Sequence, residues 1–243
     1  DFGSPAAVVQ RAGTGRAALF FYDLAAAVAR IRFGNPDLAG HATTGHWTWT
    51  HAADLFTGHV DPQSVGVPQA DLHGQLLARL VSDVCAYPAA RLWYYERPEH
   101  RTAAVIQSDD DWSTPDQFAA LAGALEAREA TATFYLMEDT RLPDRVVESM
   151  RRAGHTFGPH VNAADGGTGN MIRRFPSALA QQTAAFRTRY GRCSATLQSH
   201  CAPWAGYMNW VPLHVKHGYR LLFAYLSLPP ELYGTYMCGS GRP

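Results

Sequence analysis

Three consecutive carboxylates, Asp109, Asp110 and Asp111, follow the apolar residues Val105 and Ile106, with Gln107 and Ser108 between them. Like charges side by side repel one another, so a strand that ends in three acids indicates that the fold has a use for them. Carboxylate oxygens are ligands for divalent cations. The stretch therefore predicts a cation site, to which other parts of the chain must supply further ligands.

Two histidines stand at the ends of other predicted strands. His160 closes a predicted strand that begins at His155, and His200 follows a predicted strand over 195–199. In parallel α/β folds, functional sites form where the strands end at their carboxyl edge. Aspartate and histidine are ligand types that Zn²⁺ and related ions accept, with positions left open for water and substrate. The pattern predicts a site with one acidic and two histidine ligands.

Other roles remain open for the same side chains. Asp109 could instead cap the helix that follows the acids, and one of three adjacent acids is expected to do so. His160 could be a hydrogen-bonded core residue. His200 could pack against Trp204.

The region around these residues alternates between strand and helix patterns. Thr114, Pro115 and Gln117 form a helix start, with Thr114 as N-cap, proline at the first helical position and glutamine completing a capping box. Such alternation argues for parallel pairing and an α/β fold. The predicted strands cover 102–108, 130–137, 155–160, 195–199 and 219–225; the predicted helices cover 115–129, 143–153, 175–190 and 209–217.

The first part of the chain has a different pattern. Residues 17–24 predict a buried strand that runs into an alanine-rich helix or turn, 34–67 are loop-like, and 69–87 carry a helical stripe of apolar residues that ends at Pro88. We place the domain boundary within 88–101. The resulting prediction is a partial α/β segment over 1–95 and a larger domain over 96–243.

Composition excludes several classes of protein. The chain has 243 residues, 47% hydrophobic and 17% charged, which is typical of a globular protein. Basic and acidic residues both number 21, which predicts no nucleic-acid partner and no anionic membrane partner. No apolar run is long enough for a membrane span. We find no leader sequence and expect a mature or truncated chain. The four cysteines form no C-x-x-C pair; free thiols are favoured, and a Cys193–Cys201 disulfide stays open.

The stretches 105–111 (VIQSDDD), 154–160 (GHTFGPH) and 218–220 (GYR) resemble the polysaccharide deacetylases of carbohydrate esterase family four. These are metal-dependent amide hydrolases with a distorted (β/α) barrel. A divergent bacterial branch, in which the barrel follows a glutamine-amidotransferase-like domain, is similar over further stretches: 34–36 (GNP), 67–71 (VPQAD), 160–162 (HVN), 199–204 (SHCAPW) and 238–243 (CGSGRP). The resemblance implies an amidotransferase-like segment over 1–95 and a C-terminally incomplete barrel over 96–243. No cysteine lies at a strand-to-helix turn of the first segment, so we expect no glutaminase chemistry there.

The resemblance assigns roles to individual residues. Asp109 matches the general base, Asp110 a metal ligand and His160 the first histidine ligand. The usual second histidine, four residues further on, is Ala164 here, and His200 is the candidate replacement. The implied cofactor is a divalent metal ion, with Zn²⁺ preferred.

The implied substrate is a carbohydrate or another small acylated molecule, which an extracytoplasmic location would suit. We expect Asn162 and Trp204 to line its pocket. We expect Asp111 either to bind the substrate as well or to be a structural residue near the start of the following helix. The sequence indicates no particular oligomeric state.

Two departures from the family leave alternatives. Deacetylases use a late histidine as general acid, but His214 and His217 lie in a predicted helix, where we expect surface or helix-end positions. The arginine that orients the base has no clear counterpart, and Gln198 or Cys201 occupies its neighbourhood. The chain could therefore be a non-catalytic carbohydrate-binding or scaffolding domain. A Mg²⁺-dependent phosphohydrolase built on the three acids is a third possibility, although the glycine-rich loop over 165–170 contains no lysine.

Overall fold

The computed structural model describes residues 3–42, 49–58, 67–85, 104–164, 171–223 and 225. The chain forms two compact units, here called the N-terminal unit (Asp1–Asp37, Leu55–Thr102 and Ser227–Pro243) and the α/β unit (Leu38–Asp54 and Ala103–Leu226). The division is not a single cut near residue 95, because 38–54 join the α/β unit. The glycine-rich loop over 165–170 and the stretch 238–243 lie outside the described residues.

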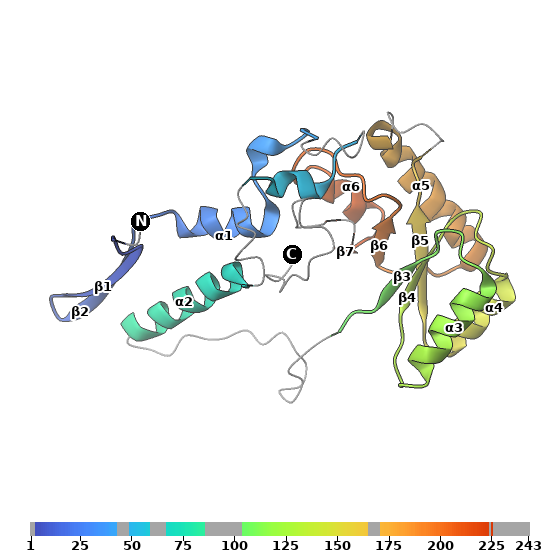
Figure 1. Cartoon of the computed structure of the whole chain (residues 1–243), viewed down its shortest axis with the longest axis horizontal. Coiled ribbons are helices and arrows are strands. Elements are labelled where there is room, and N and C mark those ends of the chain that lie inside the picture. The colour runs from blue at the N-terminus through green and yellow to red at the C-terminus, as the bar shows by residue number, and fades with distance from the viewer. Residues whose placement is uncertain are drawn as a thin grey trace. The chain divides into compact units, whose positions relative to one another are not determined.

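The N-terminal unit contains a hairpin and two helices (Figure 1). Strands β1 (Ala7–Ala12) and β2 (Gly15–Phe20) pair antiparallel, and helices α1 (Leu24–Phe33) and α2 (Gln69–Val84) follow. The Asp23 carboxylate accepts the Ala26 N–H (2.8 Å) and so begins α1. Arg32 and Asp71 join α1 to α2 through an ion pair of 2.6 Å.

The α/β unit is built on a curled, five-stranded parallel sheet. Its order, β3-β4-β5-β6-β7, follows the sequence, and every neighbouring pair is parallel. The predicted α/β class with parallel pairing is therefore confirmed. The strands are β3 Gln107–Asp109, β4 Thr133–Leu136, β5 Thr156–Val161, β6 Thr196–Ser199 and β7 Leu221–Leu222. All are shorter than predicted except β5, which has the predicted length and lies one residue later in the chain.

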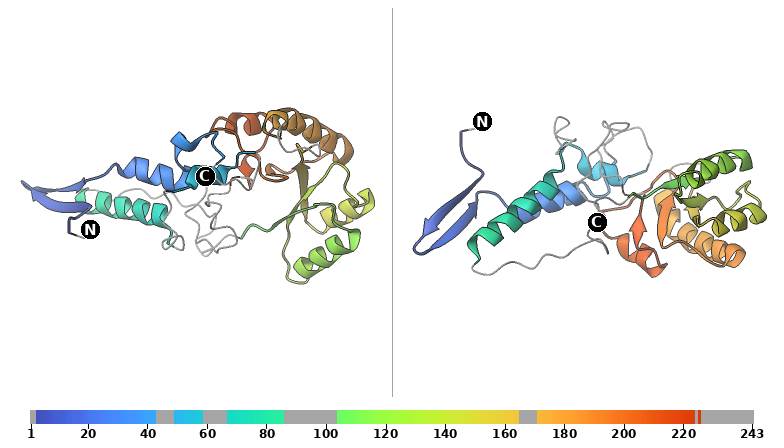
Figure 2. Two further views of the ribbon diagram at one scale, coloured as in Figure 1. Left: turned by 45° about the horizontal axis from the view of Figure 1, so that its top comes forward. Right: turned by 90° about the horizontal axis from the view of Figure 1, so that it is seen from below.

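Helices connect these strands and pack against the sheet (Figure 2). They are α3 (Pro115–Glu126), α4 (Asp144–Arg152), α5 (Met171–Tyr190) and α6 (Val211–Lys216), with the short 3-10 helices η1 (Pro36–Leu38) and η2 (Ala52–Phe56) earlier in the chain. The predicted capping box is confirmed: Thr114 Oγ1 accepts the Gln117 N–H, and Gln117 Oε1 accepts the Thr114 N–H. None of the described helices is long and apolar enough to cross a membrane.

Two apolar clusters hold the sheet and helices together. In the first, side chains of α3, α4 and α5 pack on Phe134, Leu136 and Phe157. In the second, α5 contributes a stripe with helical spacing that meets the other end of the sheet. That stripe includes Met171, so α5 begins earlier than the predicted residue 175. Both clusters lie within the α/β unit and fix the strand ends that carry the polar residues.

Thiols and one histidine also belong to the packed interior. Cys193 and Cys201 are both free thiols, so the disulfide that the sequence left possible between them is not formed. His214, predicted at a surface or helix-end position, is buried. Its ring stacks on Trp204 with centroids 5.8 Å apart, and its Nδ1 bonds the Trp210 carbonyl oxygen at 2.7 Å. Burial lowers the pKa of His214, and the hydrogen bond to Trp210 only partly opposes this.

The protein is expected to lose stability as the pH falls below about 6.5, the ordinary pKa of a histidine in the unfolded chain. Burial lowers the pKa of His51, His160 and His214 in the folded state. The unfolded chain therefore binds more protons than the folded chain between the lowered values and 6.5. Their stabilising contribution is present above this window and is lost as the pH falls through it.

Urea unfolding at about pH 7.5 and 5.5 tests this expectation. The wild type should lose more stability between the two pH values than His214→Leu. His41→Leu, at an exposed position, should behave as the wild type. Equal losses for wild type and His214→Leu would contradict the role assigned to His214.

Candidate metal centre

Three side chains with metal-ligating atoms converge at one edge of the sheet: Asp111, His160 and His200. One such atom from each lies within 4.8 Å of the other two. Asp111 Oδ1 is 2.9 Å from His200 Nδ1 and 3.3 Å from His160 Nε2. The two imidazole rings meet edge to face, with centroids 5.3 Å apart. One carboxylate oxygen thus lies beside both histidines.

The sheet topology explains why residues so far apart in sequence meet here. His160 is in β5 and pairs in register with Gln198 of β6, while His200 directly follows β6 and donates its backbone N–H to Val161 O (2.9 Å). Asp111 follows β3, two strands away from β5, and reaches the histidines from the turn after β3. All three side chains therefore come from the carboxyl ends of parallel strands, where α/β folds place their sites.

Asp110, the predicted ligand, has a different position. Its side chain is fully buried, Oδ1 accepts the Ser113 N–H (3.1 Å) and Oδ2 accepts the Met137 N–H (3.1 Å). The structure accordingly replaces Asp110 by Asp111 as the carboxylate next to His160. Asp110 instead ties the turn after β3 to the end of β4.

The backbone next to the cluster is unusual. Asp111 and Trp112 have φ values of 37° and 59°, and Cys201 and Ala202, just after His200, have φ values of 57° and 40°. Of the described residues, Glu129 is the only other non-glycine residue with positive φ. The left-handed region costs a non-glycine residue about 1–2 kcal/mol. Strained backbone of this kind gathers at functional sites, because surrounding contacts hold it in place.

His160 is the most enclosed member of the cluster. It is 2% exposed, and neither ring nitrogen forms a side-chain hydrogen bond of good geometry to the residues that the structure describes. Burial lowers the pKa of His160, although the nearby carboxylates of Asp109 and Asp111 and a weak contact with the Gln198 backbone act in the opposite direction. The ring is therefore neutral near pH 7, which is the form that binds metal ions. A bound cation would give a buried ring nitrogen of His160 a direct ligand bond in place of these weak contacts.

Asp109, the predicted base, lies beside the cluster. Its half-buried carboxylate acts electrostatically on His160, and its Oδ2 accepts a hydrogen bond from Gln198 Nε2 (2.8 Å). Gln198 is on β6 and Asp109 is the last residue of β3, so this bond spans the sheet edge. Gln198, rather than Cys201, takes the place beside the base.

A pocket of about 430 Å³ is lined by Trp112, whose ring packs against His200; Asp111, His160 and His200 are not among its lining residues. Trp112 and the predicted residue Asn162 both line it, as does Ala164 at the position of the absent histidine. The Asn162 side chain also accepts the Ala164 N–H (2.8 Å) and so shapes the turn after β5. The rest of the pocket wall is mainly polar and is formed by Met137, Glu138, Asp139, Arg174, Ser177, Ala178, Gln181 and Gln182.

Trp204, predicted in this pocket, belongs to the interior. It is 2% exposed, its indole N–H donates to Tyr207 O (2.6 Å), and its ring packs against Tyr225 and His214. The aromatic rings next to His200 are instead those of His160 and Trp112, with centroids 5.3 and 5.6 Å away. Trp112 is the aromatic side chain of the site, and its sequence position directly after the three acids was the available signal.

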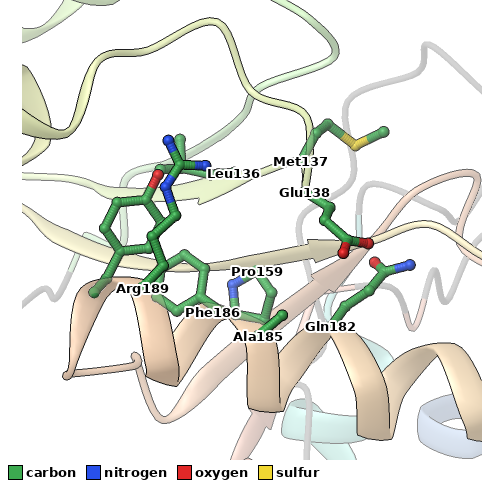
Figure 3. Close-up of a pocket in the computed structure, with 9 residues that line it drawn as sticks. Leu136, Met137, Glu138, Pro159, Gln182, Ala185, Phe186 and Arg189 are labelled. Atoms are coloured by element: carbon green, nitrogen blue, oxygen red, sulfur yellow. The ribbon is translucent and has the colours of Figure 1, made fainter.

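A second, smaller cavity of about 50 Å³ lies between β4, β5 and α5 (Figure 3). Pro159, Ala185 and Phe186 make its floor largely apolar, and its size suits one or a few water molecules rather than a substrate. Gln182 lines both cavities and pairs with the backbone of Asn162, accepting its N–H (2.9 Å) and donating to its carbonyl oxygen (2.7 Å). Gln182 thus fixes the end of β5 next to the larger pocket.

The chain matches no protein-family model, and no curated protein or solved structure is significantly similar to it. The functional reading of the site therefore rests on the geometry of its own residues.

Proposed function

We propose that this protein is a metal-dependent hydrolase that removes an acyl group, such as acetyl, from a carbohydrate or related substrate. The observation that carries the proposal is the convergence of Asp111 and His200 on the buried imidazole of His160. Among the described residues, that imidazole has no hydrogen bond of good geometry. The curled parallel sheet supports it as well, because the distorted (β/α) barrel that we propose belongs to the same α/β class of folds.

The donor set favours Zn²⁺. Two imidazoles and one carboxylate, with positions left open, make up the ligand set of many catalytic zinc sites. Mg²⁺ prefers oxygen ligands throughout and is less well suited to a site with two histidines. When bound, the cation would acidify a water molecule and polarise the acyl carbonyl.

The remaining chemistry falls to residues of the chain. Asp109 would accept the proton of the attacking water as general base, with Gln198 holding its carboxylate in place. The adjoining pocket of about 430 Å³ is within the usual size range of small-molecule sites. The side chains of Asn162, Gln181 and Ser177 can exchange hydrogen bonds with hydroxyl groups, and Trp112 offers an aromatic surface. This lining suits a hydroxylated ring.

One observation keeps a binding function without turnover as the second candidate. His214 is packed in the core with its Nδ1 on the Trp210 carbonyl, so it does not supply the late general acid. A carbohydrate-binding domain would need the pocket but no proton donor. The phosphohydrolase reading is weaker, because Asp110 is buried and occupied by two backbone N–H groups.

Turnover assays on the full chain loaded with Zn²⁺ separate these candidates. Acetylated chito-oligosaccharides, an aryl acetate and an aryl phosphate are the substrates. The proposal expects acetate release that a chelator abolishes and zinc restores, with no phosphate release. Binding of the oligosaccharide without acetate release would favour the non-catalytic candidate. A chain that binds neither zinc nor saccharide would contradict both.

Asp109→Asn is expected to lower kcat by about 100-fold or more, because general-base catalysis contributes roughly that factor. Zinc content should stay at the wild-type level, since Asp109 is not one of the three converging ligands. Steady-state kinetics with metal analysis measures both. Asp116→Asn, an acid of the first turn of α3, is the matched control and should leave kcat unchanged. Loss of zinc from Asp109→Asn would show that Asp109 is a ligand instead.

A further inference from the structure

The indole of Trp112 is anchored by a carboxylate from another loop. Its Nε1–H lies 2.9 and 3.0 Å from the two carboxylate oxygens of Asp139, which follows β4. Trp112 is 38% exposed, so burial alone does not hold the ring. A hydrogen bond to a carboxylate is among the stronger ones in proteins. The Trp112 ring is therefore held mainly by the Asp139 carboxylate and by its packing against His200.

The fixed ring packs against the proposed cation site. Trp112 is the neighbour of Asp111 in sequence, and its ring meets the imidazole of His200 edge to face at 5.6 Å. His200 meets His160 on another side at 5.3 Å, so aromatic neighbours restrict its imidazole in two directions. Release of the indole would remove one of these restrictions on His200 and one of the contacts that hold the turn carrying the Asp111 carboxylate.

The backbone adds a reason for the anchor. Asp111 and Trp112 both lie in the left-handed region, which few residues other than glycine adopt without supporting contacts. Two bonds tie the turn after β3 to the segment after β4. One is the Trp112–Asp139 bond at the surface, and the other joins buried Asp110 to the Met137 N–H. The buried bond fixes Asp110, whereas the surface bond acts on the residue next to Asp111.

We infer that Trp112 and Asp139 are positioning residues that hold the Asp111 carboxylate and the His200 ring in the arrangement that binds a cation. This inference rests on the proposed metal-dependent function, and neither residue is assigned contact with the ion. If the bound cation requires that arrangement, cation binding and the Trp112–Asp139 bond must stabilise each other to the same extent. Removing the carboxylate at position 139 should therefore weaken cation binding from outside the ligand set.

The first test needs no metal. The ring resonances of His200 are compared by NMR in the cation-free full chain for wild type, Asp139→Ala and Glu138→Ala. Glu138→Ala is the matched control, because this substitution removes a neighbouring exposed carboxylate that lines the same pocket. The inference expects the His200 signals to move in Asp139→Ala and to stay in Glu138→Ala. Unchanged signals in Asp139→Ala would overturn it.

The second test titrates the same proteins, together with Trp112→Phe, with Co²⁺ followed by its visible absorption. Asp139→Ala and Trp112→Phe should bind Co²⁺ about 10- to 100-fold more weakly than wild type, the usual range for residues that support metal ligands. Glu138→Ala should match the wild type, and all urea midpoints should stay close together. Wild-type affinity in both positioning variants would overturn the inference. Absence of Co²⁺ binding by the wild type would instead contradict the proposed cation site, and the His200 signals would still decide the positioning role.

Discussion

Replacement of His160 by leucine is expected to weaken Zn²⁺ binding by at least about 100-fold while making the cation-free protein more stable. The loss of affinity follows because a ligand is removed. The gain in stability follows because the imidazole is 2% exposed and its nitrogens lack good hydrogen bonds within the described part of the chain. A buried polar group in that state costs about 1–3 kcal/mol, and leucine removes this cost.

His155 provides the matched control for this result. It is also 2% exposed, but its Nδ1 accepts the Ala132 N–H (3.0 Å) and its Nε2 lies 3.2 Å from Glu126 Oε1. His155→Leu should therefore destabilise the protein by about 1–3 kcal/mol and leave Zn²⁺ affinity unchanged. Urea unfolding with a chelator and calorimetric zinc titration measure the two quantities. Equal destabilisation by both substitutions would contradict the view that His160 is kept for a ligand.

The second large effect separates two neighbouring acids. Asp110→Asn is expected to destabilise the protein by about 1–3 kcal/mol, because it places an amide group where two backbone N–H donors need acceptors. Asp111→Asn should change the free energy of unfolding by no more than about 0.5 kcal/mol, since the side chain is exposed and asparagine tolerates a left-handed backbone.

Zinc affinity should show the reverse order. Asp111→Asn is expected to bind Zn²⁺ about 10- to 100-fold more weakly, whereas Asp110→Asn should keep wild-type affinity wherever it is folded. Titrations at a temperature well below the unfolding midpoint of Asp110→Asn keep the comparison valid. Loss of zinc binding in Asp110→Asn with retention in Asp111→Asn would restore the ligand expected from the sequence and contradict the observed geometry.

Local patterns in the sequence were sufficient to predict much of the α/β unit. The capping box at Thr114 and Gln117 depends on residues three apart, and it forms as predicted. The alternation of strand and helix patterns indicated parallel pairing, because consecutive strands joined by helices run in the same direction. The carboxyl ends of β5 and β6 bring His160 and His200 together for the same reason.

The choice among the three acids could not be read from the sequence. It depends on the strand ending at Asp109 and on the left-handed turn that follows, and these are set by contacts with residues far along the chain. The Met137 N–H, for example, holds Asp110 from the next strand. Trp112 was overlooked for a similar reason, because its importance comes from Asp139 and His200 rather than from its own neighbours.

Burial of polar side chains was also difficult to predict. His214 was expected at a surface or helix-end position, but the aromatic rings of Trp204 and Phe175 pack against it in the interior of the fold. Trp204 was expected in the pocket because it lies close in sequence to the candidate ligand His200. In the structure it packs against Tyr225 in the core. Both outcomes depend on tertiary packing, which no local pattern records.

An anomalous-scattering map of a crystal grown with Zn²⁺, with data collected on both sides of the zinc absorption edge, tests the central claim most directly. The expected result is one strong peak about 2.0–2.2 Å from a carboxylate oxygen of Asp111 and from a ring nitrogen each of His160 and His200. A map without a peak among these three residues, or with zinc bound to Asp110 in place of Asp111, would contradict it.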